Sequence, residues 1–201
     1  MSLRVLIIAL TFATILFQLP VKAAEPTGSP KSLGIFGNWS AYTAHEGDQE
    51  VCYMLLISHP NQPPPLKTRG KVKDKAAKRG SIYLMITERP AEGSKDVVSY
   101  TAGYNFKPIS DVKIELGKTQ FSLFTQNDTA WSRDATTDRA LAAAIRFGKS
   151  MRVTGVSVHG QTLTDTLDIK GSSAAYTAIG KACGLDVENP KSLPNKKKKS
   201  K

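Results

Sequence analysis

Hydrophobic and polar residues alternate along short segments through most of the chain. In SIYLMIT, for example, Ile82, Leu84 and Ile86 fall on one side of an extended backbone, because successive side chains of a strand point to opposite faces. Seven segments are rich in β-branched or aromatic residues and are separated by Gly, Pro or Asp: 38–44, 51–58, 81–87, 96–103, 119–125, 151–158 and 162–169. Short strands with regular turn residues are typical of sandwiches and barrels.

Two segments in the C-terminal half have helical spacing instead. In TTDRALAAAIRFGKS, Leu141 and Ile145 lie on one apolar stripe, and Thr137 or Asp138 is the expected N-cap. In GSSAAYTAIGKACG, the same spacing turns Cys183 toward the protein interior. The predicted fold is therefore mainly β, an antiparallel β-sandwich or barrel-like domain with two short α-helices in the C-terminal half.

The last predicted strand places a carboxylate among apolar residues. In TLTDTLDI, Asp165 shares one face with Leu163, Leu167 and Ile169. A carboxylate that points toward a core must be paired or hydrogen-bonded, unless a bulge turns it away. We therefore expect a partner for Asp165 in the interior.

The first residues read as a secretory signal peptide. Arg4 supplies the positive charge, Val5 to Leu19 form an apolar run too short for the roughly 20 residues of a membrane span, and VKA precedes a cleavage site after Ala23. No later segment is apolar enough to span a membrane. The expected organisation is a cleaved signal peptide at 1–23, a flexible segment at 24–35, one domain at 36–187 with a basic Pro/Lys-rich loop at 59–80, and a disordered Lys-rich tail at 188–201.

The chain has two cysteines, Cys52 and Cys183. Because oxidising compartments form and keep disulfides, export favours one bridge between them, which would join an early strand to a late helix. A zinc site would need clustered Cys and His ligands, whereas His45, His59 and His159 stand alone in the sequence. A reactive thiol is the remaining alternative, although the end of a helix raises a thiol pKa.

The net charge of +11 is concentrated in two basic segments that are poor in apolar residues. The first is a basic cluster of Lys67, Arg69, Lys71, Lys73, Lys75, Lys78 and Arg79. The second is a basic tail that contains Lys196, Lys197, Lys198, Lys199 and Lys201. Both are candidates for binding an anionic lipid or glycan surface, the alternative being simple solvation. Export, and basic residues that do not alternate with aromatic ones, argue against nucleic acid as the partner.

Motifs for catalysis or cofactor binding are weak. GKT at 117–119 and GKS at 148–150 lack the upstream glycine of a phosphate-binding loop. Pairs of aspartates such as Asp128 with Asp134 have no spacing that fixes an acid and a base. The sequence therefore predicts no catalytic residue, no cofactor and no metal. An exported hydrolase or thiol/redox enzyme, with a site assembled from distant residues, remains the alternative.

The chain resembles the invasion-associated locus B family of bacterial envelope proteins in the order and spacing of seven segments: GNWSAYTA, VCYMLLISHP, RGSIYLMITERP, SYTAGYNF, FSLFTQNDTAW, LAAAIRFGKSMRVTGVSVHG and TDTLDIKGSSAAYTAIGKACG. The matching positions are Trp39, Cys52, Arg79, Gly80, Arg89, Pro90, Gly103, Tyr104, Trp131, Gly155, Ser157, Gly160, Asp165, Leu167, Gly171 and Cys183. The 59–80 segment and the Lys-rich tail depart from the family's usual pattern.

The resemblance implies an exported, mostly β domain that is found chiefly in alphaproteobacteria and is linked in some pathogens to entry into host red cells. It supplies no catalytic residues. The expected function is therefore a non-enzymatic, envelope-associated binding protein in the periplasm, at the outer membrane or secreted. Its expected partner is an envelope or host-surface protein, or an anionic lipid or glycan. The sequence sets no oligomeric state.

Overall fold

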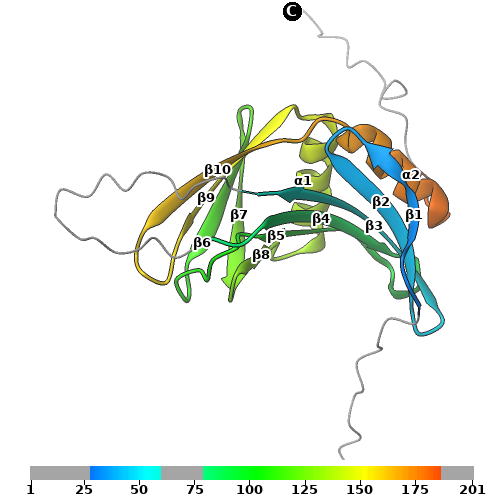
Figure 1. The fold of residues 1–201 in the computed structure, drawn as a ribbon, viewed down its shortest axis with the longest axis horizontal. Coiled ribbons are helices and arrows are strands. Elements are labelled where there is room, and N and C mark those ends of the chain that lie inside the picture. The colour runs from blue at the N-terminus through cyan, green and yellow to red at the C-terminus, as the bar shows by residue number, and fades with distance from the viewer. Residues whose placement is uncertain (1–27, 60–78, 187–201) are drawn as a thin grey trace, which may run out of the picture.

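Within residues 28–59 and 79–186, which the computed structural model describes, ten strands form one curved antiparallel sheet that does not close (Figure 1). The strands are β1 (Lys31–Phe36), β2 (Trp39–Glu46), β3 (Gln49–Ser58), β4 (Ile82–Arg89), β5 (Ser94–Thr101), β6 (Asp111–Leu116), β7 (Thr119–Gln126), β8 (Thr129–Trp131), β9 (Ser150–Val156) and β10 (Thr162–Asp168). Their order in the sheet is β1-β2-β3-β4-β5-β8-β7-β6-β9-β10. The expected signal peptide, most of the basic loop and the Lys-rich tail lie outside the described residues.

The prediction of a mainly β fold is confirmed, but the predicted sandwich is wrong. The two arms of the sheet, β1 to β5 and β6 to β10, belong to one sheet and share one core, which includes Leu56 and Ile86 from the first arm and Ile114 and Val153 from the second. Alternation looks the same in two packed sheets and in one sheet that curves over its own core. The barrel-like alternative is not a closed barrel here, because β1 and β10 are the two ends of the sheet within the described residues.

The sequence pattern missed three strands. β1 begins at Lys31, inside the 24–35 segment that was expected to be flexible, and pairs with β2 across a bulge between Ser32 and Gly34. β6 buries Val112, Ile114 and Leu116 on alternate positions. β8 has only three residues, which is too short for an alternation signal.

Two helices cover the core, and both were predicted. Helix α1 (Ala135–Phe147) packs against β5, and helix α2 (Ser172–Ala182) packs against β1 to β3 (Figure 1). Helix α1 starts earlier than expected, because the carboxylate of Asp134 accepts the N–H of Thr137 at 2.8 Å and is the true N-cap. Between β4 and β5 lies one short 3₁₀ helix, η1 (Pro90–Glu92).

The chain between β10 and α2 passes very close to the turn between β1 and β2. Gly171 has a φ of 96°, and a β-carbon there would lie 1.9 Å from the carbonyl oxygen of Phe36. Only glycine allows both this backbone conformation and this approach. The contact holds the end of β10 beside the start of β2, and this arrangement defines one end of the cleft described next.

Candidate functional site, an open cleft between β3 and β10

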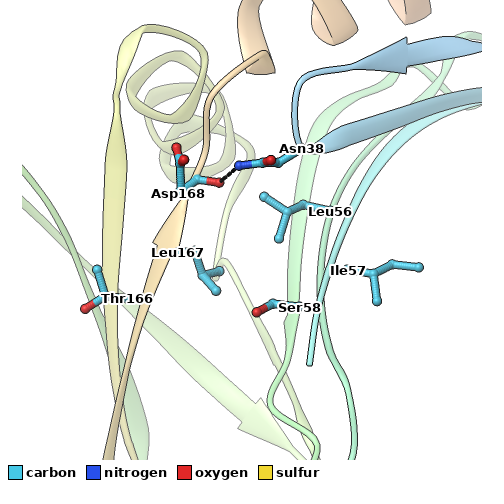
Figure 2. A pocket seen from close by; sticks show the side chains of 7 residues that line it. All are labelled: Asn38, Leu56, Ile57, Ser58, Thr166, Leu167 and Asp168. Atoms are coloured by element: carbon cyan, nitrogen blue, oxygen red, sulfur yellow. Dashed lines mark hydrogen bonds between the residues drawn. The ribbon is translucent and has the colours of Figure 1, made fainter. Parts of the chain in front are cut away.

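The curved sheet leaves a cleft where β10 comes close to the last residues of β3 (Figure 2). Leu56, Ser58 and Leu167 point toward one another across it, while Ile57 and Thr166 point away. The cavity has a volume of about 320 Å³ and is lined by Asn38, Leu56, Ile57, Ser58, Thr166, Leu167 and Asp168. Its side chains are apolar or uncharged except for Asp168.

Asn38 closes one end of the cleft. Its side-chain amide donates to the carbonyl oxygen of Asp168 at 2.9 Å, and its backbone N–H donates to the carbonyl oxygen of Lys170 at 3.0 Å. Next to it, the indole N–H of Trp39 donates to the carbonyl oxygen of Ile169 at 3.2 Å. These bonds join the start of β2 to the chain that follows β10, so the distance between the two arms is fixed at this end.

A buried ion pair joins the arms a few residues away, on the inner face of β10. Arg79, just before β4, donates from Nη1 and Nη2 to the two carboxylate oxygens of Asp165 at 2.7 and 2.6 Å. The side chains of Arg79 and Asp165 are only 6% and 10% exposed. Two parallel bonds of this kind combine charge attraction with fixed geometry. The expectation that Asp165 has an interior partner is therefore confirmed.

Two tyrosines and a backbone carbonyl complete this ion-pair cluster. The hydroxyl of Tyr100 donates to Asp165, and Nε of Arg79 donates to the carbonyl oxygen of Ala102 at 2.8 Å. The guanidinium of Arg79 lies 4.8 Å from the ring centroid of Tyr104, which is the geometry of a cation–π contact. Every member is thus in contact with another member, and the ion-pair cluster works as a brace between β5 and β10.

Burial and charge together shift the pKa values in the ion-pair cluster. Burial lowers the pKa of Arg79, but the hydrogen bonds and charge of Asp165 outweigh it, so this pKa is raised overall. Burial and the charge of Asp165 raise the pKa of Tyr100 strongly. Burial also raises the pKa of Tyr104 to about 12, against the opposing charge of Arg79. Both tyrosines therefore stay protonated at physiological pH, and neither is a ready general base.

Arg79 was predicted to belong to the anionic-surface site, but the structure places it in the interior. Its guanidinium is occupied by Asp165 and buried, so it is not exposed to an anionic partner. The other members of the basic cluster (Lys67, Arg69, Lys71, Lys73, Lys75 and Lys78) and the tail lysines (Lys196, Lys197, Lys198, Lys199 and Lys201) lie outside the described residues.

Cys52 of β3 and Cys183 at the end of α2 form a disulfide, with 6.0 Å between their α-carbons. The predicted bridge from an early strand to a late helix is confirmed. Neither cysteine is a free thiol in this structure. The bridge fixes α2 to the sheet.

A second buried polar cluster lies between the sheet and the helices, near the disulfide. Glu88, the cross-strand neighbour of Cys52, accepts the backbone N–H of Asp96 at 3.1 Å, and Asp96 accepts the hydroxyl of Tyr176 at 2.6 Å. From α1, Asp138 accepts the backbone N–H of Val98 at 3.0 Å. Carboxylates from β4, β5 and α1 thus meet beneath the helices, and we call them, with Tyr176, the acidic cluster.

Burial raises the pKa of Glu88 to about 7, and the charge of Asp96 adds to this effect, while the N–H of Asp96 and the charge of Lys95 oppose it. Burial likewise raises the pKa of Asp138. Glu88 therefore changes charge near neutral pH.

In the described part of the chain, no group of three or more His, Cys, Asp or Glu side chains is placed to hold a metal ion. Within residues 28–59 and 79–186, no helix has the length and apolar character needed to cross a membrane.

Comparison with known proteins decides the family. The family described as "Invasion associated locus B (IalB) protein" matches residues 39–180 of this chain. The chain belongs to the invasion associated locus B family. A search of curated proteins finds no match. Among solved structures, the chain is similar to the crystal structure of invasion associated protein B from Bartonella henselae, with a TM-score of 0.53 and 15% identity over 77% of this chain and 97% of that one.

Five of the positions that carried the resemblance in the sequence take part in two structural contacts. Arg79, Tyr104 and Asp165 belong to the ion-pair cluster, and Cys52 and Cys183 form the disulfide. These residues are far apart in the chain, and their contacts depend on how the arms curve. Arg79 and Asp165 thus link two segments of the sheet, and the disulfide links α2 to β3.

Sequence reasoning missed the cleft itself. Leu56 and Leu167 fit a core pattern, and Asn38 stands out only as the first residue of NWS, a weak glycosylation motif. What the sequence lacked was the strand order that leaves β10 at an edge.

Proposed function

We propose that this protein is an exported, envelope-associated protein that acts by binding and not by catalysis. Membership in the invasion associated locus B family supports this proposal, as does the Cys52–Cys183 disulfide, which suits an oxidising compartment. The observation that carries it is the cleft, whose lining side chains are uncharged except for Asp168 and which lies beside β10, the last strand of the sheet in the described residues. In the neighbouring ion-pair cluster, two titratable groups are joined by a hydrogen bond, which the hydroxyl of Tyr100 donates to Asp165.

The partner class in this proposal is an envelope or host-surface protein, or an anionic lipid or glycan. The two basic segments of the sequence favour anionic surfaces, because clustered lysines attract them at low ionic strength. The most specific element of the proposal is a role in host-cell entry, which rests on family membership alone.

Export and attachment are tested in the native host. The intact mass of the protein from an envelope fraction, alkylated without reduction, should correspond to a chain that starts at Ala24, lacks two hydrogens and carries no alkyl group. A variant that lacks residues 191–201 and has neutral residues at Lys67, Arg69, Lys71, Lys73, Lys75 and Lys78 should lose envelope association at low salt. Unchanged association would remove the anionic-surface part of the proposal.

A further inference from the structure

Strand β5 contains a bulge beside the acidic cluster. Thr87 of β4 pairs with Val97 and Arg89 pairs with Ser94, so two residues of β5 lie opposite Glu88. The second of these two, Asp96, has a φ of 60°, a left-handed conformation that is uncommon for residues other than glycine. Its N–H donates to the side chain of Glu88 at 3.1 Å. A buried side-chain carboxylate therefore completes the hydrogen bonding of this bulge.

The bulge places Asp96 against helix α2. The carboxylate of Asp96 accepts the hydroxyl of Tyr176, in the middle of α2, at 2.6 Å. Cys52, the cross-strand partner of Glu88, is bonded to Cys183 at the C-terminal end of the same helix. Two bonds close to Glu88 therefore join α2 to the sheet. One is covalent, and the other is accepted by a carboxylate of the acidic cluster.

Charges near Glu88 and Asp96 decide when this second bond is stable. The other charged or titratable groups around the pair come from β5, α1 and α2: Lys95, Asp138, Arg146 and Tyr176. Burial, with the charge of Asp96, raises the pKa of Glu88 to about 7, although Lys95 opposes this shift. Burial and Asp96 also raise the pKa of Tyr176, so its hydroxyl remains a donor at physiological pH. Loss of the proton from Glu88 puts a second negative charge beside Asp96.

We propose that Glu88, Asp96 and Tyr176 form a pH-dependent latch, which holds the C-terminal half of α2 on the sheet while Glu88 is protonated and lets it open locally when Glu88 is ionised. In the open state the carboxylates reach water and move apart. The disulfide still tethers the end of α2, so the opening is reversible. The latch does not depend on the binding function proposed above, and either can fail without the other.

Opening of this latch increases with pH. The closed state holds the proton of Glu88 more tightly than the open state, in which the carboxylate is solvated, so a rise in pH favours the open state. The pKa of Glu88 is about 7 when closed and returns toward its ordinary value of 4.5 when open. The equilibrium constant for opening should therefore rise on the order of a hundredfold between about pH 4.5 and about pH 8.

Reduction of the disulfide reports on the opening, because Cys52 is fully buried and Cys183 is only 8% exposed. The reductant is tris(2-carboxyethyl)phosphine, which gives two thiols and takes up the oxygen of one water molecule as the phosphine oxide. Full oxidised wild type and Glu88→Gln are compared at the same pH, so that the pH dependence of the reductant cancels. We expect rates within about threefold of each other at about pH 4.5, and wild type at least about tenfold faster at about pH 8. Glu92→Gln, which removes an exposed charge on η1, is the matched control and should keep the wild-type rates.

A carboxylate that merely stands beside the disulfide would have the opposite effect. The phosphine carries negative carboxylates, so an ionised Glu88 in a rigid structure would repel it and make wild type slower than Glu88→Gln at about pH 8. Equal or slower reduction of wild type at that pH would therefore overturn the latch.

Hydrogen exchange locates the opening. In wild type, the protection of the Ile179 and Gly180 amides in α2 should fall at least about tenfold between about pH 4.5 and about pH 8, with a weak dependence on urea that marks local opening. Glu88→Gln should remove most of this fall. The amides of Met54 and Ile86 in the core strands should have the full urea dependence of global unfolding. If the α2 amides share that full dependence, α2 opens only when the whole domain unfolds and the proposal fails.

Tyr176→Phe tests the bond between the acidic cluster and α2. Phenylalanine keeps a ring beside the guanidinium of Arg146, which lies 4.6 Å from the ring centroid, but it donates nothing to Asp96. Reduction at about pH 4.5 should become at least about threefold faster, because the protonated cluster no longer holds α2 through this bond. Tyr83→Phe, at an exposed ring, is the control. An unchanged rate for Tyr176→Phe would show that the cluster does not hold α2, and would overturn the latch.

Discussion

The ion-pair cluster and the acidic cluster lie in the same interior but balance charge in opposite ways. In the ion-pair cluster, Arg79 neutralises Asp165 through two hydrogen bonds. In the acidic cluster, the charge of Asp96 adds to burial in raising the pKa of Glu88 to about 7. A compensated pair holds its geometry at any physiological pH, whereas crowded carboxylates respond to pH. The first cluster braces the arms of the sheet beside the cleft, and the second makes the helix side of the core sensitive to pH.

The largest effect is expected from removing the disulfide next to the acidic cluster. In the chain-entropy estimate, a loop as long as the one between Cys52 and Cys183 contributes about 5 kcal/mol to the free energy of unfolding. The double variant Cys52→Ala with Cys183→Ala should therefore lose most of its stability in urea denaturation. Reduced wild type is the control and should lose a similar amount. A loss below about 1 kcal/mol would show that packing alone holds α2 on the sheet.

Breaking the ion pair should have the next largest effect. Asp165→Asn leaves the buried guanidinium of Arg79 without a counter-charge, which costs about 4 kcal/mol in comparable pairs. The matched control is Asp111→Asn, which breaks the Arg133–Asp111 pair, whose side chains are 58% and 51% exposed. Exposed pairs contribute less than about 1 kcal/mol. Equal losses in urea denaturation for the two variants would mean that the Arg79–Asp165 pair does not brace the sheet.

The sequence predicted that Asp165 needs an interior partner, but it did not identify which residue that partner is. Alternation placed Asp165 among Leu163 and Leu167, and the physics of burial required a partner. Nothing in the sequence placed Arg79 beside Asp165. Arg79 lies 86 residues away, next to a lysine-rich segment that is typical of a solvent-exposed loop. Local charge density suggested a surface role, and the curvature of the sheet overrode that interpretation.

The disulfide and the two helices were predictable for the opposite reason. The export expected from the N-terminal sequence and the presence of only two cysteines leave a single intramolecular pairing. Helical spacing turns Cys183 inward without any knowledge of strand order. The acidic cluster gave no such signal. Glu88 and Asp138 look like ordinary surface acids in the sequence. In the folded chain both are buried, with α1 packed on β5 and Tyr176 of α2 bonded to Asp96.

The acidic cluster predicts stability that rises as pH falls. The pKa of Glu88 is raised from its ordinary value of 4.5 to about 7 in the folded protein. The folded state therefore binds more protons than the unfolded state between these values. The stabilisation is complete below about pH 4.5 and is lost as pH rises through 7, with a maximum of about 3 kcal/mol. Asp138 acts in the same direction, because burial raises its pKa too.

Glu88→Gln isolates this effect. The amide keeps the shape and an acceptor for the N–H of Asp96 but carries no charge at any pH. We expect the variant to be about 2 kcal/mol more stable than wild type at about pH 8 and no more stable at about pH 5. Glu92→Gln removes the charge of an exposed carboxylate on η1 and is the matched control. A wild-type stability that falls as the pH is lowered through this range would contradict the assignment to Glu88.

The smallest expected effects come from the two tyrosines, which make the same bond in the two clusters. Tyr100 donates to Asp165, which keeps two bonds from Arg79 when the hydroxyl is removed, so Tyr100→Phe should cost about 1 kcal/mol. Tyr176 donates to Asp96, which lies beside the buried carboxylate of Glu88, so Tyr176→Phe should cost about 2 kcal/mol. Tyr83→Phe, at an exposed ring, is the control. Urea denaturation in mildly alkaline buffer measures all three. Because losing a donor matters most where carboxylates crowd together, a larger loss for Tyr100→Phe than for Tyr176→Phe would reverse the proposed contrast between the clusters.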